Sequence, residues 1–148
     1  MRPRLSIILL LSLTTLGACG GIGGLLGRGS DPTGYQITLN REVFDRGNTG
    51  EVTIRNRSNE SLEYNLCPRR LERRSGNGWT GTFEWPTAGG ACTTEARLLS
   101  AGAAVNALFE IPTGLTAGTY RLVFTGLRGA GGEQLSSDQQ ATPAFQIR

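Results

Sequence analysis

Three cysteines are the side chains best suited to covalent chemistry in this chain of 148 residues, which contains no histidine and no lysine. The absence of histidine excludes a Ser-His-Asp triad, a Cys-His pair and a histidine-ligated metal. The absence of lysine excludes a Schiff base. What remains is the chemistry of Cys19, Cys67 and Cys92, namely lipid attachment, disulfide formation or thiol redox exchange.

The first 18 residues have the layout of an export signal. Arg2 and Arg4 precede an apolar run at residues 5–16. As a helix, about 12 residues reach about 18 Å, well short of a hydrocarbon core of about 30 Å. The run therefore predicts the hydrophobic region of a signal peptide rather than a membrane span, and we assign residues 1–18 to that signal.

The signal ends on Leu16, Gly17, Ala18 and Cys19, a motif that resembles the lipobox of bacterial lipoproteins. In that family the cysteine receives diacylglycerol before cleavage. The resemblance implies that Cys19 is the acylated mature N-terminus and that the lipid bilayer of the cell envelope is a partner, because two or more acyl chains anchor stably. Gly20, where aspartate retains such proteins at the inner membrane, favours the outer membrane if the source is a didermal bacterium. An ordinary secretory signal with an incidental Cys19 is the alternative.

Residues 19–34 are rich in glycine and predict a flexible tether. A phosphate-binding glycine loop would have to follow a strand and open a helix, whereas this segment follows a cleavage site.

From residue 35 onward, apolar and polar residues alternate in short runs separated by turn residues, as they do in half-buried strands. No helix of ten residues is indicated. The runs predict an antiparallel β-sandwich of seven or eight strands, with a bulge or strand break after Pro68. The expected strands are at residues 35–39, 51–55, 62–66, 82–85, 98–99, 105–109, 120–124 and 143–147.

Residues 35–148 resemble bacterial immunoglobulin-like domains. The residues that carry the resemblance are Asn56, the run Leu71, Glu72 and Arg73 followed by Trp79, Leu99 before the turn at Ala101 and Gly102, and Leu115, Gly118, Tyr120, Arg121 and Leu122. The resemblance implies an all-β immunoglobulin-like sandwich with Trp79 in its core, a tight turn at Gly118 and a tyrosine corner at Tyr120. Family members often have Pro-Gly where this chain has Ala101 and Gly102. Such domains are mostly binding or spacing modules.

Cys67 and Cys92 are expected to form a disulfide, because exported thiols are normally oxidised and the two form an even pair once Cys19 is acylated. The enclosed loop contains Trp79, Phe83 and Trp85. We expect Trp79 in the core, and Trp85 is the better candidate for a surface contact. A redox-active pair is the alternative, but catalytic dithiols are usually close together in sequence.

Arg69, Arg70, Arg73 and Arg74 form the only run of charge, which we interpret as a solvated strand edge. Contact with anionic lipid head groups or surface polysaccharide is the alternative. The formal net charge of +3 falls to +1 when residues 1–18 are removed, so no nucleic-acid partner is expected. Arg121 is expected to make a structural ion pair.

Neither a metal, a cofactor nor an enzymatic activity is expected. The three aspartates form no calcium loop and the nine glutamates fall in no catalytic motif. The sequence thus predicts a membrane-anchored lipoprotein whose domain is a non-catalytic binding or structural module for a protein or glycan of the envelope. The alternative is a proteinase-inhibitor-like domain that uses the loop at residues 126–142, including Leu127 and Arg128, although its glycines suggest flexibility.

Overall fold

The computed structural model describes residues 34–86 and 90–148. The expected signal peptide, nearly all of the tether and Cys19 lie outside these residues. No helix in the described part is long and apolar enough to cross a membrane. The described residues form nine strands: β1 (Tyr35–Leu39), β2 (Val43–Phe44), β3 (Thr49–Asn56), β4 (Leu62–Ser75), β5 (Gly78–Trp85), β6 (Arg97–Leu99), β7 (Ala104–Glu110), β8 (Gly118–Leu127) and β9 (Phe145–Ile147).

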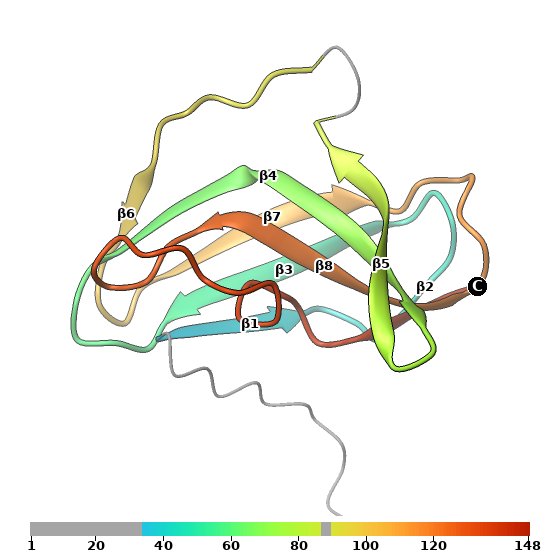
Figure 1. Ribbon diagram of the computed structural model, residues 1–148, viewed down its shortest axis with the longest axis horizontal. Helices are drawn as coiled ribbons and strands as arrows, with labels where there is room; N and C mark the ends of the chain where they lie inside the picture. Colours follow the sequence, from blue (N-terminus) through green and yellow to red (C-terminus); the bar gives the residue numbers. More distant parts are fainter. Residues whose placement is uncertain (1–33, 87–89) are drawn as a thin grey trace, which may run out of the picture.

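The strands form two sheets packed face to face (Figure 1). The small sheet has the order β1-β3-β7, and the large sheet has the order β2-β9-β8-β4-β5, with β6 also paired to β4. All pairs are antiparallel except β2 with β9. This is the order of immunoglobulin-like sandwiches, in which strands A, B and E face strands G, F, C and C′. The chain is therefore an all-β immunoglobulin-like sandwich, as predicted.

The core follows from the alternation of side chains along the central strands. Val52 and Ile54 of β3 and Leu122 and Phe124 of β8 are fully buried between the sheets. At one end, three phenylalanines form an aromatic cluster with ring centroids 5.2 to 6.1 Å apart, namely Phe44, Phe109 and Phe145. The space between the sheets is thus filled by residues from strands far apart in the sequence.

Several strands have other bounds than predicted, and the differences at β2 and β4 change the arrangement of the sheet. β2 was not predicted, because two residues carry no periodic signal and its stability comes from pairing Val43 with Gln146 and Phe44 with Ile147. β4 continues through Pro68 to Ser75, and its pairing with β8 shifts register between Asn65 and Arg69. The predicted irregularity is therefore a bulge within one long strand.

The arginine run does not lie on a strand edge, so that prediction is wrong. Arg69, Arg70, Arg73 and Arg74 belong to β4, which pairs with β8 on one side and with β5 on the other. Arg69 and Arg70 are half-buried and Arg73 and Arg74 are exposed. Side chains alternate between the two faces of a strand, so the four arginines are divided between the inner and outer faces of this central strand instead of lining a solvated edge.

Trp79 does not occupy the core, and the physical reason is a second bulge. Phe83 of β5 lies opposite Leu71, but the pairing with β4 shifts between Leu71 and Glu72, and Trp79 lies opposite Arg74. A shift of one residue moves the rest of a strand to the other face. Phe83 therefore points inward, whereas Trp79 is half-buried on the outer face.

Candidate functional site

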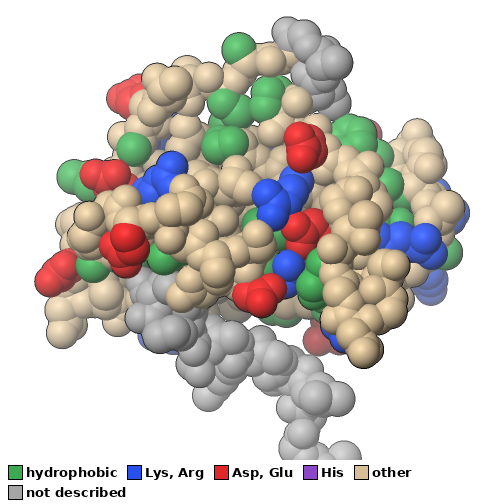
Figure 2. Space-filling model, viewed as in Figure 1, with side chains coloured by type: hydrophobic (Ala, Val, Ile, Leu, Met, Phe, Trp, Pro, Cys, Tyr) green, Lys and Arg blue, Asp and Glu red, His purple; other side chains and the backbone are tan. Residues whose placement is uncertain are grey.

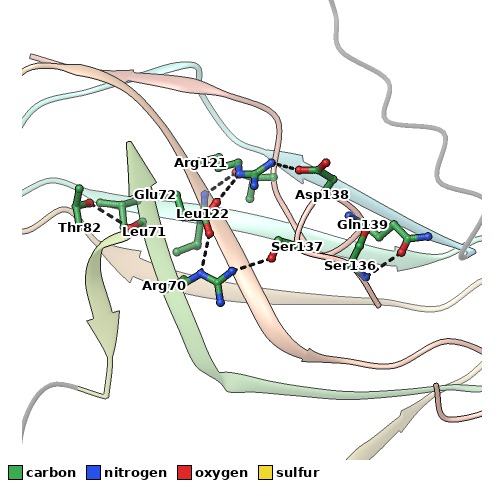
Figure 3. A network of polar contacts seen from close by, with 11 residues as sticks. Arg70, Leu71, Glu72, Thr82, Arg121, Leu122, Ser136, Ser137, Asp138 and Gln139 are labelled. Carbon is green, nitrogen blue, oxygen red and sulfur yellow. Dashed lines mark hydrogen bonds and ion pairs between the residues drawn. The ribbon is translucent and has the colours of Figure 1, made fainter. Parts of the chain in front are cut away.

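An ion-pair network crosses the outer face of the large sheet (Figure 3). Glu72 of β4 accepts hydrogen bonds from Arg70 Nε and from Arg121 Nε, both at 2.7 Å. Arg121 also pairs with Asp138 in the segment after β8. Figure 2 shows acidic and basic side chains alternating across the middle of this face. The ion pair expected for Arg121 is confirmed.

The network neutralises buried charge. Glu72 and Arg121 are 6% and 8% exposed, and unpaired charges at such positions would be costly. Burial by itself raises the pKa of the Glu72 carboxyl, but the hydrogen bonds from Arg70 and Arg121 outweigh it and leave the pKa below its usual value. Glu72 is therefore held as a carboxylate.

The segment at residues 128–142 doubles back along the large sheet (Figure 1) and is held there by specific contacts. Ser137 Oγ accepts a hydrogen bond from Arg70 at 2.8 Å. The buried Gln140 side chain donates to the carbonyls of Thr125 and Leu127. Leu127 itself is fully buried. A protease cleft could not receive Leu127 without unfolding this end of the sheet.

Trp79 is stacked against two guanidinium groups on the same outer face. Arg121 lies 4.6 Å and Arg74 5.3 Å from the centroid of its ring. Cation–π contacts of this kind stabilise a partly exposed tryptophan without placing it in a core. Trp79 thus covers one end of the ion-pair network.

The remaining arginines of the run make local contacts. Arg69 lies 5.4 Å from the Trp85 ring and donates to the carbonyl of Leu66. Burial lowers the pKa of Arg69, and its buried Nε makes no hydrogen bond within the described residues. Arg73 donates to the carbonyl of Ala117. The run is therefore divided among separate contacts and forms no single basic surface.

A groove of about 530 Å³ lies on the inner side of β5, where the sandwich is open. One wall is formed by Phe83 and Trp85 of β5, whose rings pack edge to face. The opposite wall is formed by the end of β7 and the connection to β8. Its residues are Glu110, Pro112, Thr113, Gly114 and Leu115, and Thr82 completes the lining. Trp85 is thus half-buried, with its ring packed against the core on one side and lining the groove on the other.

The wall formed by the β7–β8 connection is fixed by a tyrosine corner, which confirms that prediction. Tyr120 is 1% exposed, and its hydroxyl donates to the carbonyl of Thr116 at 2.6 Å. Gly118 enters β8 with φ of +155°, and a Cβ there would lie 3.0 Å from Arg73 Nε. Arg46 Nε also donates to the carbonyl of Leu115. The groove therefore has a rigid side.

The predicted disulfide between Cys67 and Cys92 is present, with the two Cα atoms 5.6 Å apart. It joins β4 to the segment between β5 and β6. Nearby, Asn65 Nδ2 donates to the carbonyls of Thr93 and Glu95. These contacts tie the segment at residues 90–96 to the start of β4, and Figure 1 shows that it arches away from the sheets in yellow.

No cluster of three or more histidine, cysteine, aspartate or glutamate side chains within the described ranges could hold a metal ion. The polar groups that line the groove are one carboxylate, on Glu110, and the hydroxyls of Thr82 and Thr113. Together with two aromatic rings, these groups are suited to binding and orienting a partner.

Comparison with known proteins finds distant likenesses in structure. No protein-family model and no curated protein sequence matches the chain. The sporulation control protein Spo0M of Bacillus subtilis is 11% identical with a TM-score of 0.42, over 77% of this chain and 48% of that one. The DNA-bound alkylpurine DNA glycosylase AlkC of Pseudomonas fluorescens is 15% identical with a TM-score of 0.40, over 78% and 30%. The PapD-like domain 7 of human CEP192 is 14% identical with a TM-score of 0.29, over 98% and 94%.

The chain therefore spans less than half the length of the glycosylase and of Spo0M. The assignment of the fold depends on the strand order of the chain itself.

Sequence reasoning missed the groove. Phe83 and Trp85 stand out in the sequence as aromatic residues of the disulfide loop, and Leu115 belongs to the motif that includes Tyr120. No motif includes the other lining residues Glu110 and Pro112. No local signal connects residues 82–85 with residues 110–115, because the two walls belong to different sheets. The aromatic residues on alternate positions of β5 were the one available sign of an apolar inner surface.

Proposed function

We propose that this protein is a membrane-anchored lipoprotein whose immunoglobulin-like domain is a non-catalytic binding module of the cell envelope. The observation that carries the proposal is the Cys67–Cys92 disulfide. Disulfides persist in oxidising compartments outside the cytosol. Because this bridge uses two of the three cysteines, Cys19 remains for acylation directly after the apolar run. If the source is a didermal bacterium, the outer membrane is the favoured location.

The binding role is supported by the groove. Two aromatic side chains and one carboxylate converge on an open surface, as at many binding sites. A protein or a glycan of the envelope is the proposed partner. The inhibitor alternative has no comparable support, since Leu127 is buried and the segment at residues 128–142 is pinned to the large sheet.

Anchoring is tested by labelling cells with a palmitate analogue. Cys19→Ser should abolish the label and leave the precursor uncleaved, because no thiol remains at the acylation position. Ala18→Ser is the matched control, which changes the neighbouring residue and keeps the thiol, so it should be labelled and processed. Retention of the label by Cys19→Ser would refute the anchor.

Binding is tested by photo-crosslinking in intact cells from two exposed positions. A crosslinker at Thr113 lies in the groove, whereas one at Arg74 lies on the outer face beside Trp79. An adduct from position 113 without the same adduct from position 74 is expected. Identical adducts from both positions, or none from either, would argue against a groove-directed partner.

A further inference from the structure

The outer edge of β5 and the groove beside it form one continuous surface. Among residues 34–86 and 90–148, β5 is the last strand of the large sheet and pairs with β4 alone. It has eight residues, of which Glu84 alone is charged. Edge strands of this length are usually protected by charges, proline, a bulge or a covering segment, because their free backbone groups can pair with another strand. β5 has one charge and one bulge, which lies opposite Leu71 and Glu72. The stretches of β5 on either side of this bulge are suited to receive another strand.

A strand added to this edge would place its side chains in the groove. Side chains of a strand alternate between the two faces of its sheet. Phe83 and Trp85 point to the inner side of β5 and line the groove, with Pro112 and Leu115 facing them. The inward side chains of an added strand would enter the same space, and apolar side chains would be favoured there.

The charge in the groove selects among possible occupants. Glu110 is exposed at the end of β7 and makes no ion pair within residues 34–86 and 90–148. A carboxylate at this position favours a basic side chain on the incoming strand. A second copy of β5 would not supply one, because its sequence contains no arginine or lysine.

We propose that the β5 edge and the groove bind an extended peptide segment of another protein by strand addition. Backbone hydrogen bonds to β5 provide affinity, apolar side chains at alternate positions fill the groove, and a lysine or arginine pairs with Glu110. This inference deepens the proposed function, on which the location of the partner in the envelope depends.

The probe is a set of synthetic nine-residue peptides that alternate valine and threonine. One peptide has arginine in place of a central valine, a second has glutamate there, and a third has proline at the central position. Binding to the full chain, purified in detergent, is measured by fluorescence anisotropy. The arginine peptide is expected to bind most tightly, and the proline peptide should not bind because proline interrupts the strand.

Two glycines provide a matched pair of variants. A Cβ at Gly114, in the groove, or at Gly81, on the opposite face of β5, would meet no atom within 4 Å. Gly114→Phe should fill the groove and weaken binding of the arginine peptide at least about tenfold. Gly81→Phe adds the same side chain outside the groove and should leave binding unchanged. Thermal unfolding of both variants confirms that each is folded.

The charge is tested by Glu110→Gln, with Glu84→Gln as its control on the outer face of β5. Glu110→Gln should remove the preference for the arginine peptide over the glutamate peptide, a change of about three- to tenfold, and Glu84→Gln should keep that preference. An unaltered preference in Glu110→Gln would contradict the pairing.

Three results would overturn the proposal. The first is no binding of any alternating peptide, or equal binding by Gly114→Phe. The second is a concentration-dependent dimer that Gly114→Phe abolishes, which would identify a second copy as the occupant. The third is binding of an oligosaccharide array, but not of peptides, that Gly114→Phe abolishes. Peptide binding does not depend on acylation, and labelling of Cys19 does not depend on the groove, so the two proposals fail separately.

Discussion

The outer face of β4 and β5 and the groove on the inner side of β5 are built from neighbouring residues, yet they treat charge differently. On the outer face, Glu72 lies between Arg70 and Arg121, and Asp138 extends the network. In the groove, Glu110 faces apolar and aromatic surface and makes no ion pair within the described ranges. The charges of the outer face therefore neutralise one another, whereas the Glu110 carboxylate is available to pair with a charge on a partner.

The comparison shows why a run of arginines is a weak sign of a binding surface. Four arginines within six positions drew attention in the sequence, but each is engaged by a carboxylate, a carbonyl or an aromatic ring of its own domain. Glu110, which lies in the groove with the rings of Phe83 and Trp85, is not marked by any motif in the sequence. The charge that is available for recognition is the one that folding leaves unpaired.

The largest effect is expected from removing the Glu72 carboxylate, which lies at the centre of the ion-pair network on the outer face. Glu72→Ala should lower the free energy of unfolding by about 3 to 5 kcal/mol, because it leaves the buried Arg121 without its buried carboxylate partner. The exposed Glu84→Ala, which removes a carboxylate from the neighbouring strand, should change it by less than about 0.5 kcal/mol. Urea unfolding of the full chain measures both. Similar losses would show that the network is not internally stabilising.

The same carboxylate should make stability depend on pH. The pKa of Glu72 is lower in the folded protein than in the unfolded chain. Its contribution is therefore fully present above the unfolded pKa of about 4.3 and is lost as the pH falls through the folded pKa. Glu72→Gln should flatten the decline of stability below about pH 5. Urea midpoints measured from pH 7 to pH 3 check this, and an equally steep decline in the variant would contradict it.

A smaller effect is expected where the groove meets the core. Tyr120→Phe should cost about 1 kcal/mol, because the carbonyl of Thr116 loses its hydrogen bond. The same change should loosen the wall at Leu115 and weaken peptide binding. Tyr64→Phe is the control, since the Tyr64 hydroxyl makes no hydrogen bond in the part of the chain that the structure describes. Equal costs for the two variants would argue against a tyrosine corner that supports the groove.

The smallest loss of stability is expected at Arg74, an exposed residue beside Trp79 at the edge of the ion-pair network. Arg74→Ala removes one cation–π contact with Trp79 and should cost about 0.5 kcal/mol or less, since Arg121 still covers the ring. The fluorescence of the two tryptophans and the urea midpoint report the change. A loss as large as that of Glu72→Ala would mean that the exposed arginines share in holding the buried charges.

Much of the sandwich could be predicted from local pattern. The sequence pattern at residues 51–55 and 120–124 indicates strands, and the alternation in the first places Val52 and Ile54 inward, where both are fully buried. The motif from Leu115 to Leu122 resembles that of immunoglobulin-like domains, and this resemblance implies that the Tyr120 hydroxyl bonds to nearby backbone, as it does to the Thr116 carbonyl. These features depend on residues close together in the chain, where sequence carries the information.

Trp79 marks where prediction from pattern ends. Its spacing from Phe83 and Trp85 places all three on one face of an ideal strand, and only the bulge opposite Leu71 and Glu72 separates them. A bulge depends on how two strands pair, so spacing along β5 alone cannot reveal it.

By itself, the sequence determined the class of the fold, the pairing of Cys67 with Cys92 and the tyrosine corner, because alternation, cysteine count and a short motif are local or countable. Tertiary structure decided which charges neutralise one another and which surface stays open. Arg121 meets Glu72, and Glu110 meets the aromatic wall of β5, only after strands distant in sequence have paired in register. Register is a property of two segments together, and one residue of slip exchanges a buried side chain for an exposed one.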